Sequence, residues 1–307
     1  MLRCDDYYLP ATLDEAFDLI ERFPGEHRII AGGTDLLPWA REGRAGDVHI
    51  PVLIDISRVA EMRGQKAQDG RIRLGANTTF AEFLKDPFLK RHLPVMAHAA
   101  IWFADDQLRA AATLAGNLVN GSPAGDGIPP MVAMEGSVVL ESRKDGKRHT
   151  RTVPVADFIQ GPGKTLLEPG ELMTAIECDD MEGWGSAFEK VGHRRSLVIS
   201  TCCVAALVKV DWATRRFADV RLAIGAVGPV PCRAKELEQS LIGQPVTAET
   251  IRSLSDRTAG FVRSRSRQEY RRKVLASFVE RALGDALDEL GIAPVSQPVH
   301  GEERLHA

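Results

Sequence analysis

Apolar residues recur at helical spacing in the first part of the chain. Between Thr12 and Pro24 they fall on one helical face, and Thr12 with Glu15 forms a capping-box pattern. Pro24 and Gly25 then end the predicted helix. Three further helices are predicted near the C-terminus, at residues 232–242, 247–263 and 268–290.

Runs rich in β-branched residues predict the strands. The run that begins at His27 and the run that begins at Pro51 follow the first helix, and this alternation predicts a small parallel unit. A hairpin is predicted at residues 137–155 with its turn at Asp145-Gly146. Beyond residue 184, three long runs predict antiparallel strands at 186–191, 197–211 and 217–228.

Together these elements predict an α+β protein with two domains. Residues 1–178 form the first, with a small parallel βαβ subdomain at about 1–56 and a mixed or antiparallel sheet with helices at about 57–178. Residues 179–290 form a smaller α+β domain of three antiparallel strands and a helical bundle. The Pro-rich, polar residues 291–307 are expected to form a loose tail.

Composition and charge narrow the classes of function. The 307 residues carry a formal net charge of −3, which gives no global attraction to nucleic acid. No apolar run reaches the roughly 18 residues that a membrane span needs, and the acidic N-terminus lacks the apolar core of a secretory signal. We therefore expect a cytoplasmic protein with no membrane span and no nucleic-acid partner. The eight basic residues within 252–273 indicate a solvated helix face or a docking surface.

The five cysteines do not suggest a metal centre. They show no C-x-x-C spacing, and Cys202 with Cys203 sits in an apolar run that is typical of a core strand. The histidines are scattered along the sequence and do not predict a general base. No catalytic residue and no metal ligand is therefore expected in this chain.

Two glycine-bearing segments are the candidates for ligand binding. In Ile29–Leu36, Gly32 and Gly33 follow an apolar run, which indicates either a tight turn or a loop whose N–H groups face a phosphate. Residues 111–127 mix glycine, serine, asparagine and proline, and this composition predicts a loop. Polar side chains supply donors and acceptors within it: Thr113, Asn117, Asn120, Ser122 and Asp126. Asp126 has the chemistry to accept hydrogen bonds from sugar hydroxyls.

Neither a G-x-G-x-x-G pattern nor a P-loop is present, so a dinucleotide would be held by a different fold. The chain resembles the FAD-binding (medium) subunits of the molybdenum hydroxylases, the group that includes xanthine dehydrogenase and carbon monoxide dehydrogenase. The resemblance runs in order over residues 7 to about 285, in the segments AGGTDLLP, WFADDQLRAAATLAGNLVNGSPAGDGIPP, ELMTAIE, AFEKVGHRRSLVISTCCVA and YRRKVLASFVERAL. It implies a PCMH-type FAD-binding domain in the first part of the chain.

The resemblance also implies which residues meet FAD. Ile29, Ile30, Ala31, Gly32, Gly33, Thr34, Asp35 and Leu36 would wrap the pyrophosphate with backbone N–H groups. Phe103 would pack on the cofactor, and Thr113 would contact it through its hydroxyl. Leu114, Ala115, Gly116 and Asn117 resemble a loop near the flavin. Further contacts are implied for Ser122, Asp126, Met173 and Lys190, whereas the residues alone allow Phe103 and Met173 to be simple core residues.

The function implied is electron transfer rather than acid–base chemistry. A large partner subunit would carry the molybdopterin cofactor, a small one the [2Fe–2S] clusters, and the complex would be a dimer of heterotrimers. FAD on this chain would pass electrons from those clusters to an external acceptor, and residues 191–200, with Arg194 and Arg195, are the candidate loop near the flavin edge. The related 4-hydroxybenzoyl-CoA reductases carry an inserted [4Fe–4S] cluster, but no cysteine lies between Cys4 and Cys178 here, so that cluster is expected to be missing. The alternative is a stand-alone FAD-dependent oxidase or dehydrogenase of the vanillyl-alcohol-oxidase class.

Overall fold

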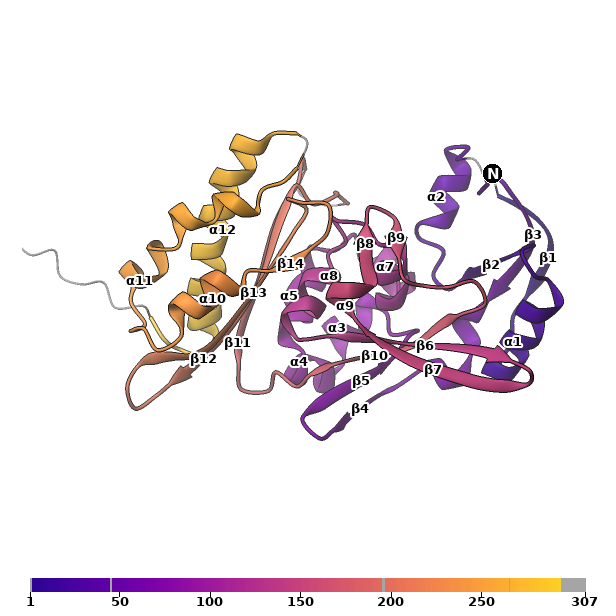
Figure 1. The fold of residues 1–307 in the computed structure, drawn as a ribbon, viewed down its shortest axis with the longest axis horizontal. Helices are drawn as coiled ribbons and strands as arrows, with labels where there is room; N and C mark the ends of the chain where they lie inside the picture. Colours follow the sequence, from indigo (N-terminus) through magenta and orange to yellow (C-terminus); the bar gives the residue numbers. More distant parts are fainter. Residues whose placement is uncertain (1, 45, 195–196, 265, 294–307) are drawn as a thin grey trace, which may run out of the picture.

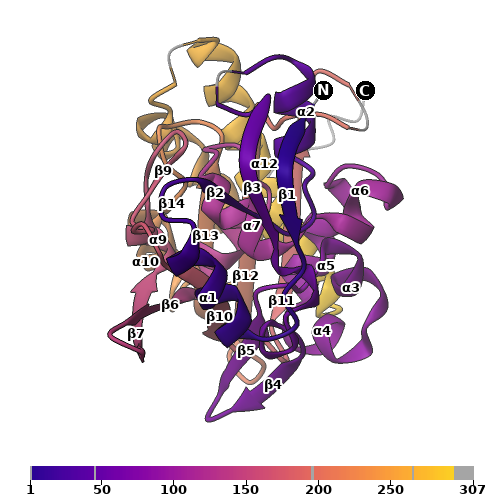
Figure 2. The same cartoon turned by 90° about the vertical axis from the view of Figure 1, so that its right-hand side faces the viewer.

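The computed structural model describes residues 2–44, 46–194, 197–264 and 266–293. Its three larger β-sheets follow one another along the molecule (Figure 1). The first is a parallel sheet of order β1-β3-β2, formed by Arg3–Tyr8, His49–Asp55 and His27–Ile30. Helix α1 (Leu13–Arg22) follows β1, and α2 (Leu36–Arg41) connects β2 to β3. The predicted small parallel unit is therefore confirmed. Figure 2 shows this unit end-on.

A five-stranded antiparallel sheet lies in the middle of the molecule. Its order is β4-β5-β10-β6-β7, formed by Gln65–Gln68, Arg71–Gly75, Leu172–Asp179, Ser137–Lys144 and Lys147–Pro154. The predicted hairpin is β6–β7, with Asp145 at φ 51° and Gly146 at φ 71° in its turn. The helices of this part are α3 to α9: Phe80–Lys85, Pro87–His92, Pro94–Trp102, Asp106–Ala111, Leu114–Asn120, Ile128–Ala133 and Val155–Phe158. Strands β8 (Ile159–Gly161) and β9 (Lys164–Thr165) pair separately.

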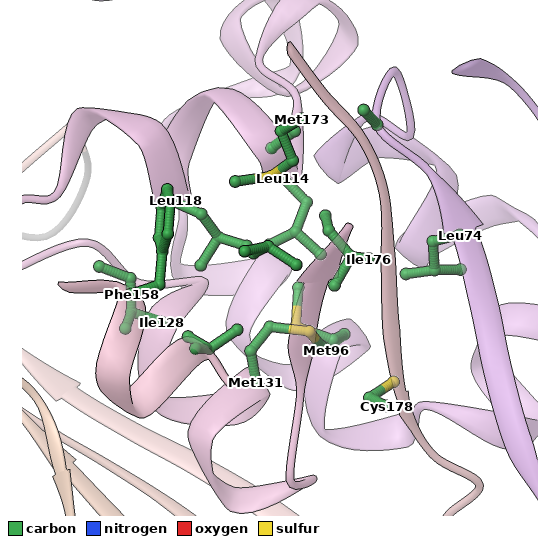
Figure 3. Packing of buried hydrophobic residues seen from close by; sticks show 14 of the residues in the cluster. Leu74, Met96, Leu114, Leu118, Ile128, Met131, Phe158, Met173, Ile176 and Cys178 are labelled. Carbon is green, nitrogen blue, oxygen red and sulfur yellow. The ribbon is translucent and has the colours of Figure 1, made fainter. Parts of the chain in front are cut away.

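The prediction that residues 111–127 form a loop was wrong in its central part. Leu114–Asn120 forms helix α7, whose first N–H groups are capped by the Thr113 side chain. Gly121 ends the helix in the left-handed conformation, at φ 60°. Glycine and asparagine lower helix propensity, but the apolar face of α7 packs into the core, where Leu114 and Leu118 lie near Met173 of β10 (Figure 3).

The third sheet has the order β11-β12-β13-β14: Gly185–Val191, Cys202–Asp211, Arg216–Gly225 and Cys232–Arg233. The first three are the predicted antiparallel strands, and the short β14 adds to them. Helices α10 (Lys235–Leu241), α11 (Ala248–Arg252) and α12 (Gln268–Glu289) follow, and α12 covers the outer face of this sheet (Figure 1). Short 3₁₀ turns occupy Ile56–Arg58, Ala60–Met62, Ser255–Arg257 and Ala259–Phe261. The α+β prediction is confirmed, while the predicted tail lies from residue 294 on outside the described residues.

Strand β12 is buried on both faces and joins two cores. Cys203, Ala205 and Leu207 belong to the core of the middle sheet, whereas the alternate residues of the strand pack under α12. Side chains on a strand point alternately to its two faces, so a strand that is buried on both reads as the continuous apolar run seen in the sequence. In the part of the chain that the structure describes, no helix is long and apolar enough to cross a membrane.

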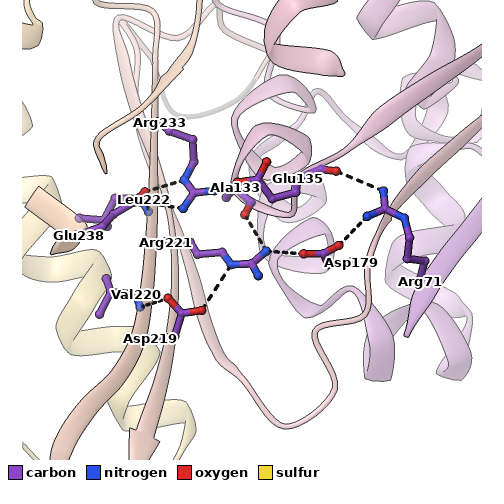
Figure 4. Close-up of polar contacts among 10 residues, drawn as sticks. All are labelled: Arg71, Ala133, Glu135, Asp179, Asp219, Val220, Arg221, Leu222, Arg233 and Glu238. Atoms are coloured by element: carbon purple, nitrogen blue, oxygen red, sulfur yellow. Dashed lines mark hydrogen bonds and ion pairs between the residues drawn. The ribbon is translucent and has the colours of Figure 1, made fainter. Parts of the chain in front are cut away.

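An ionic network ties the middle sheet to the third (Figure 4). The Asp179 carboxylate at the end of β10 accepts from Arg71 of β5 at 2.7 Å and from Arg221 of β13 at 2.8 Å. Arg221 also packs against the Trp184 ring, with 4.9 Å from its guanidinium carbon to the ring centroid. The carboxylate thus joins cations from two sheets.

Replacing Asp179 with alanine is expected to lower the free energy of unfolding by about 2 kcal/mol, because hydrogen bonds to charged groups contribute about 1.5–3 kcal/mol. Urea denaturation measures the change. Asp219→Ala is the matched control, since Asp219 lies 3.9 Å from the same Arg221 and is more exposed. That control should cost less than about 1 kcal/mol. Equal losses in the two variants would contradict the bridging role of Asp179.

Glu189 on β11 predicts a pH-dependent stability. Burial raises the pKa of its carboxyl to about 7, Arg281 opposes that rise, and a hydrogen bond with Asp285 adds to it. A carboxyl with a raised pKa in the folded state stabilises the fold most at low pH, and this contribution is lost as pH rises towards 7. In urea denaturation between about pH 4.5 and 7, wild type should lose stability more steeply than Glu189→Gln. Parallel curves would show that Glu189 is ionised in the folded protein.

Candidate functional site

The first glycine loop leaves β2 with its amides free. Among the described residues, the backbone N–H groups of Gly32, Gly33, Thr34 and Asp35 donate to no protein acceptor. Gly33 has φ 65°, in the left-handed region that favours glycine. Consecutive free N–H groups form a concave donor surface, which is the chemistry that binds a phosphate or diphosphate.

The second glycine-bearing segment, residues 111–127, is fixed by backbone hydrogen bonds to the chain between β5 and α3. The N–H of Phe80 donates to the carbonyl of Ala112 at 3.0 Å, and the N–H of Leu114 donates to the carbonyl of Thr78 at 2.9 Å. Thr113 lies between these bonds, and its hydroxyl accepts from the N–H of Gly116 at 3.0 Å. The hydroxyl therefore caps α7, and this use of its oxygen was not expected from the sequence.

The two segments meet at Gly32. A Cβ atom placed on Gly32 would lie 1.9 Å from the carbonyl oxygen of Ala111, a distance that no side chain tolerates. Glycine at this position thus permits close approach of one protein segment to another. The residues alone allowed a tight turn or a phosphate-binding loop here, and the family resemblance implied close approach to a ligand.

A cavity of about 290 Å³ lies where the segments meet, and twelve of the predicted residues line it: Ile29, Ile30, Ala31, Gly32, Gly33, Thr34, Asp35, Leu36, Phe103, Thr113, Gly116 and Asn117. A second cavity of about 130 Å³ adjoins it and is lined by two more, Ala115 and Met173. Both cavities share part of their walls, including Ile29, Thr113 and Gly116. The free amides and the mainly apolar second cavity fit a ligand that has an anionic centre and a flat apolar end, as FAD has.

Phe103 contributes to the core and to the cavity at once. Its ring stacks on Phe80, with 3.8 Å between the centroids and 7° between the planes. The same side chain lines the first cavity. Asn117 likewise lines the cavity, while its side-chain oxygen accepts from the N–H of Gly127 at 3.1 Å. Both residues are therefore positioned by protein contacts.

Three predicted residues do not line these two cavities: Ser122, Asp126 and Lys190. The Lys190 ammonium lies 2.5 Å from Oδ2 of Asp126, and the Ser200 hydroxyl donates to Oδ1 at 2.6 Å. Burial raises the pKa of the Asp126 carboxyl, and Lys190 and Ser200 oppose the rise. The structure thus brings Asp126 and Lys190 to each other, so the Asp126 oxygens already have protein donors.

A third cavity, of about 220 Å³, lies next to this ion pair. Lys190, Trp102 and Arg194 line it together with Val198. Val191, Gly192, Arg194 and Val198 of the candidate loop 191–200 therefore border a hollow. Arg195 lies outside the described residues.

Several cavity-lining residues were not predicted from the sequence. Arg28, Trp39 and Arg44 also line the first cavity. Their signal in the sequence was weak, because the two arginines are sixteen positions apart and neither belongs to a recognised motif. Asp35, which was expected, is half-buried without a side-chain capping bond, and burial raises the pKa of its carboxyl.

His92, Asp180 and Glu182 come together near the end of β10, with their ligand atoms within 4.8 Å of one another. The His92 ring contacts the Asp180 carboxylate at 2.9 Å, and Glu182 pairs with Arg91. These side chains already bond one another, so the cluster acts as an ion-pair network within the described chain.

Comparison with known proteins agrees with this geometry. Residues 2–178 match a family described as "FAD binding domain in molybdopterin dehydrogenase", and residues 186–286 match one described as "CO dehydrogenase flavoprotein C-terminal domain". A putative xanthine dehydrogenase FAD-binding subunit of Escherichia coli K12 is 32% identical over 292 residues, covering 93% of this chain and 97% of its own. The nicotinate dehydrogenase FAD-subunit of Eubacterium barkeri is 32% identical over 305 residues, with the same coverage.

The fold agrees as well. A carbon monoxide dehydrogenase structure from Hydrogenophaga pseudoflava superposes with a TM-score of 0.83 at 28% identity, covering 94% of this chain and 99% of the other. Fold and cavity define an FAD-binding oxidoreductase component. The chain belongs to the family of FAD-binding medium subunits of molybdopterin dehydrogenases.

Gly32→Ala should separate the two segments that form the cavity. A methyl group at this position meets the Ala111 carbonyl, so we expect at least a tenfold weaker FAD affinity in a titration followed by flavin fluorescence, together with a lower Tm. Gly260→Ala is the control, because a Cβ there meets no atom within 4 Å. An FAD affinity for Gly32→Ala equal to that of the control would show that the contact does not shape the site.

Proposed function

We propose that the chain is the electron-transfer subunit of a heteromeric molybdopterin-dependent dehydrogenase, in which bound FAD supplies the redox chemistry between [2Fe–2S] clusters of a partner and an external acceptor. The observation that carries this proposal is the convergence of two distant segments on one cavity lined by free backbone amides. The matches to FAD-binding subunits over nearly the whole chain support it.

The residues of this chain would bind and orient the cofactor. We assign the diphosphate to the amides of Gly32, Gly33, Thr34 and Asp35, since they form the donor surface of the cavity. Phe103 would shield the ligand from water and hold it through a side chain already fixed by Phe80. The apolar second cavity, with Met173 in its wall, would take a ring system.

Asp126 and Lys190 would have a different role from direct contact. Their ion pair joins the segment after α7 to β11, and Lys190 lines the third cavity. We assign the pair the positioning of this cavity wall. Ser122, whose hydroxyl accepts from the N–H of Ala124 at 3.3 Å, would shape the same segment.

The family membership also supports a proposal for the assembly. We propose a large molybdopterin-binding subunit and a small [2Fe–2S] subunit as partners, in a dimer of heterotrimers in the cytoplasm. Within this chain we propose an FAD-binding domain at residues 1–178 and a C-terminal domain at 179–290, divided between β10 and β11.

A stand-alone flavin oxidase is the second candidate. It would need its own substrate pocket with acid–base groups beside the flavin. Among the described residues, each of the two cavities is lined by one carboxyl, that of Asp35 in the first and that of Glu171 in the second, and by no histidine. Glu171 is already paired with Arg151 at 2.7 Å. This lining favours the electron-transfer subunit.

Purification from the native source tests the proposal. The chain should carry FAD at close to one per chain, seen in its absorbance spectrum, and should copurify with two further subunits, one with molybdopterin and one with iron and sulfide. FAD-containing chain that elutes alone and oxidises a substrate would support the stand-alone oxidase. A chain that cannot be loaded with FAD would contradict both candidates.

A further inference from the structure

Three side chains that line the first cavity take no part in the proposed contacts with the diphosphate or the ring system. Arg28 lies in β2, Trp39 in α2 and Arg44 in the turn after α2, and all three line the cavity that the first glycine loop borders. They come from the parallel sheet unit and not from the second segment. This wall therefore belongs to the same small unit as the free amides.

One buried carboxylate orients both arginines. Asp47 is only 2% exposed, and its oxygens lie 3.3 Å from Nη2 of Arg28 and 3.4 Å from Nε of Arg44. The arginine side chains themselves are about half exposed, at 47% and 55%. A guanidinium has five N–H donors, so an ion pair with Asp47 leaves each arginine donors for a ligand.

Trp39 and Arg44 form a stacked pair. The guanidinium carbon of Arg44 lies 4.0 Å from the centroid of the Trp39 ring. This contact fixes the plane of the guanidinium and places an aromatic ring beside it in the cavity wall. Guanidinium groups bind phosphate through paired hydrogen bonds, and aromatic rings stack on bases, so the pair has the chemistry to bind a nucleotide.

A purely structural role does not account for both arginines. Asp47 needs one guanidinium to balance its charge, and the second leaves a positive charge at the cavity. Asp35 is the single acidic residue among the described residues that line this cavity, whereas two guanidinium groups line it. Half-exposed guanidinium donors attract an anionic ligand.

We propose that Arg28, Trp39 and Arg44 form an outer subsite that binds the phosphate and base of a nucleotide. The inference rests on the proposed function, because the subsite opens into the proposed FAD cavity. Two nucleotides share the required chemistry, namely the ADP part of FAD and the nucleotide of an NAD⁺-type electron acceptor. The subsite adds charged side chains to a site otherwise built from backbone amides.

The test uses the purified complex, from which FAD is removed and then titrated back. In the double variant Arg28→Gln/Arg44→Gln and in Trp39→Ala, the FAD dissociation constant should rise at least tenfold, measured by flavin fluorescence. In the double variant its dependence on salt should also become weaker. Arg41→Gln is the matched control, since Arg41 is an exposed arginine of α2 that lines neither cavity. Arg44→Lys keeps the charge but loses the planar stack and should fall between wild type and the double variant.

A second titration separates the two sources of the nucleotide. If FAD affinity stays within twofold of wild type while the dissociation constant of NAD⁺ for the FAD-loaded complex rises tenfold, the subsite serves the acceptor. FAD affinity that is unchanged, together with NAD⁺ binding that is absent or unaltered, overturns the inference. A wild-type chain that binds no FAD would overturn the proposed function instead.

Discussion

The close approach of Gly32 to the carbonyl of Ala111 is the constraint on which the candidate site depends. The parallel sheet unit and the middle sheet each supply one wall, and neither encloses a cavity alone. The segment with Ala111 is fixed by two backbone hydrogen bonds around Thr113, which join it to Thr78 and Phe80 between β5 and the start of α3. The glycine loop must then reach it, and any Cβ at Gly32 would prevent this contact. The contact between Gly32 and Ala111 thus fixes the position of the loop whose free amides line the cavity.

Several polar residues of the second glycine-bearing segment form hydrogen bonds within the protein. Thr113 caps α7, and Asn117 accepts a hydrogen bond from the N–H of Gly127. The Asp126 carboxylate accepts from Lys190 and Ser200. A donor or acceptor that is satisfied internally is fixed in place, which makes the cavity wall rigid. For this reason a count of polar side chains in a sequence overestimates the number that contact a ligand. The groups left free here are backbone amides, which a sequence does not display.

The sequence predicted the elements that have strong local signals. The first helix has a cap and an apolar face, and the hairpin has an Asp-Gly turn whose two residues adopt positive φ. Strand β1 was missed because its side chains are mostly exposed and show no apolar alternation, and β14 because it has two residues. The residues alone indicated either a tight turn or a phosphate-binding loop at the glycine doublet, and the family resemblance favoured the loop. Arg28 and Arg44 were missed because a buried Asp47, distant from Arg28 in sequence, brings them together.

The arrangement of the hydrophobic cores determines how firmly the sheets are joined to one another. Strand β12 belongs to two cores at once, so separating the third sheet from the middle sheet would expose apolar surface on a large scale. The parallel sheet unit contacts the rest through one face of its sheet, while Leu36, Ile50 and Leu53 form a small cluster on the other. A ligand that touches both walls stabilises the closed arrangement by its own binding free energy, so cofactor loading and the rigidity of the small unit are thermodynamically linked.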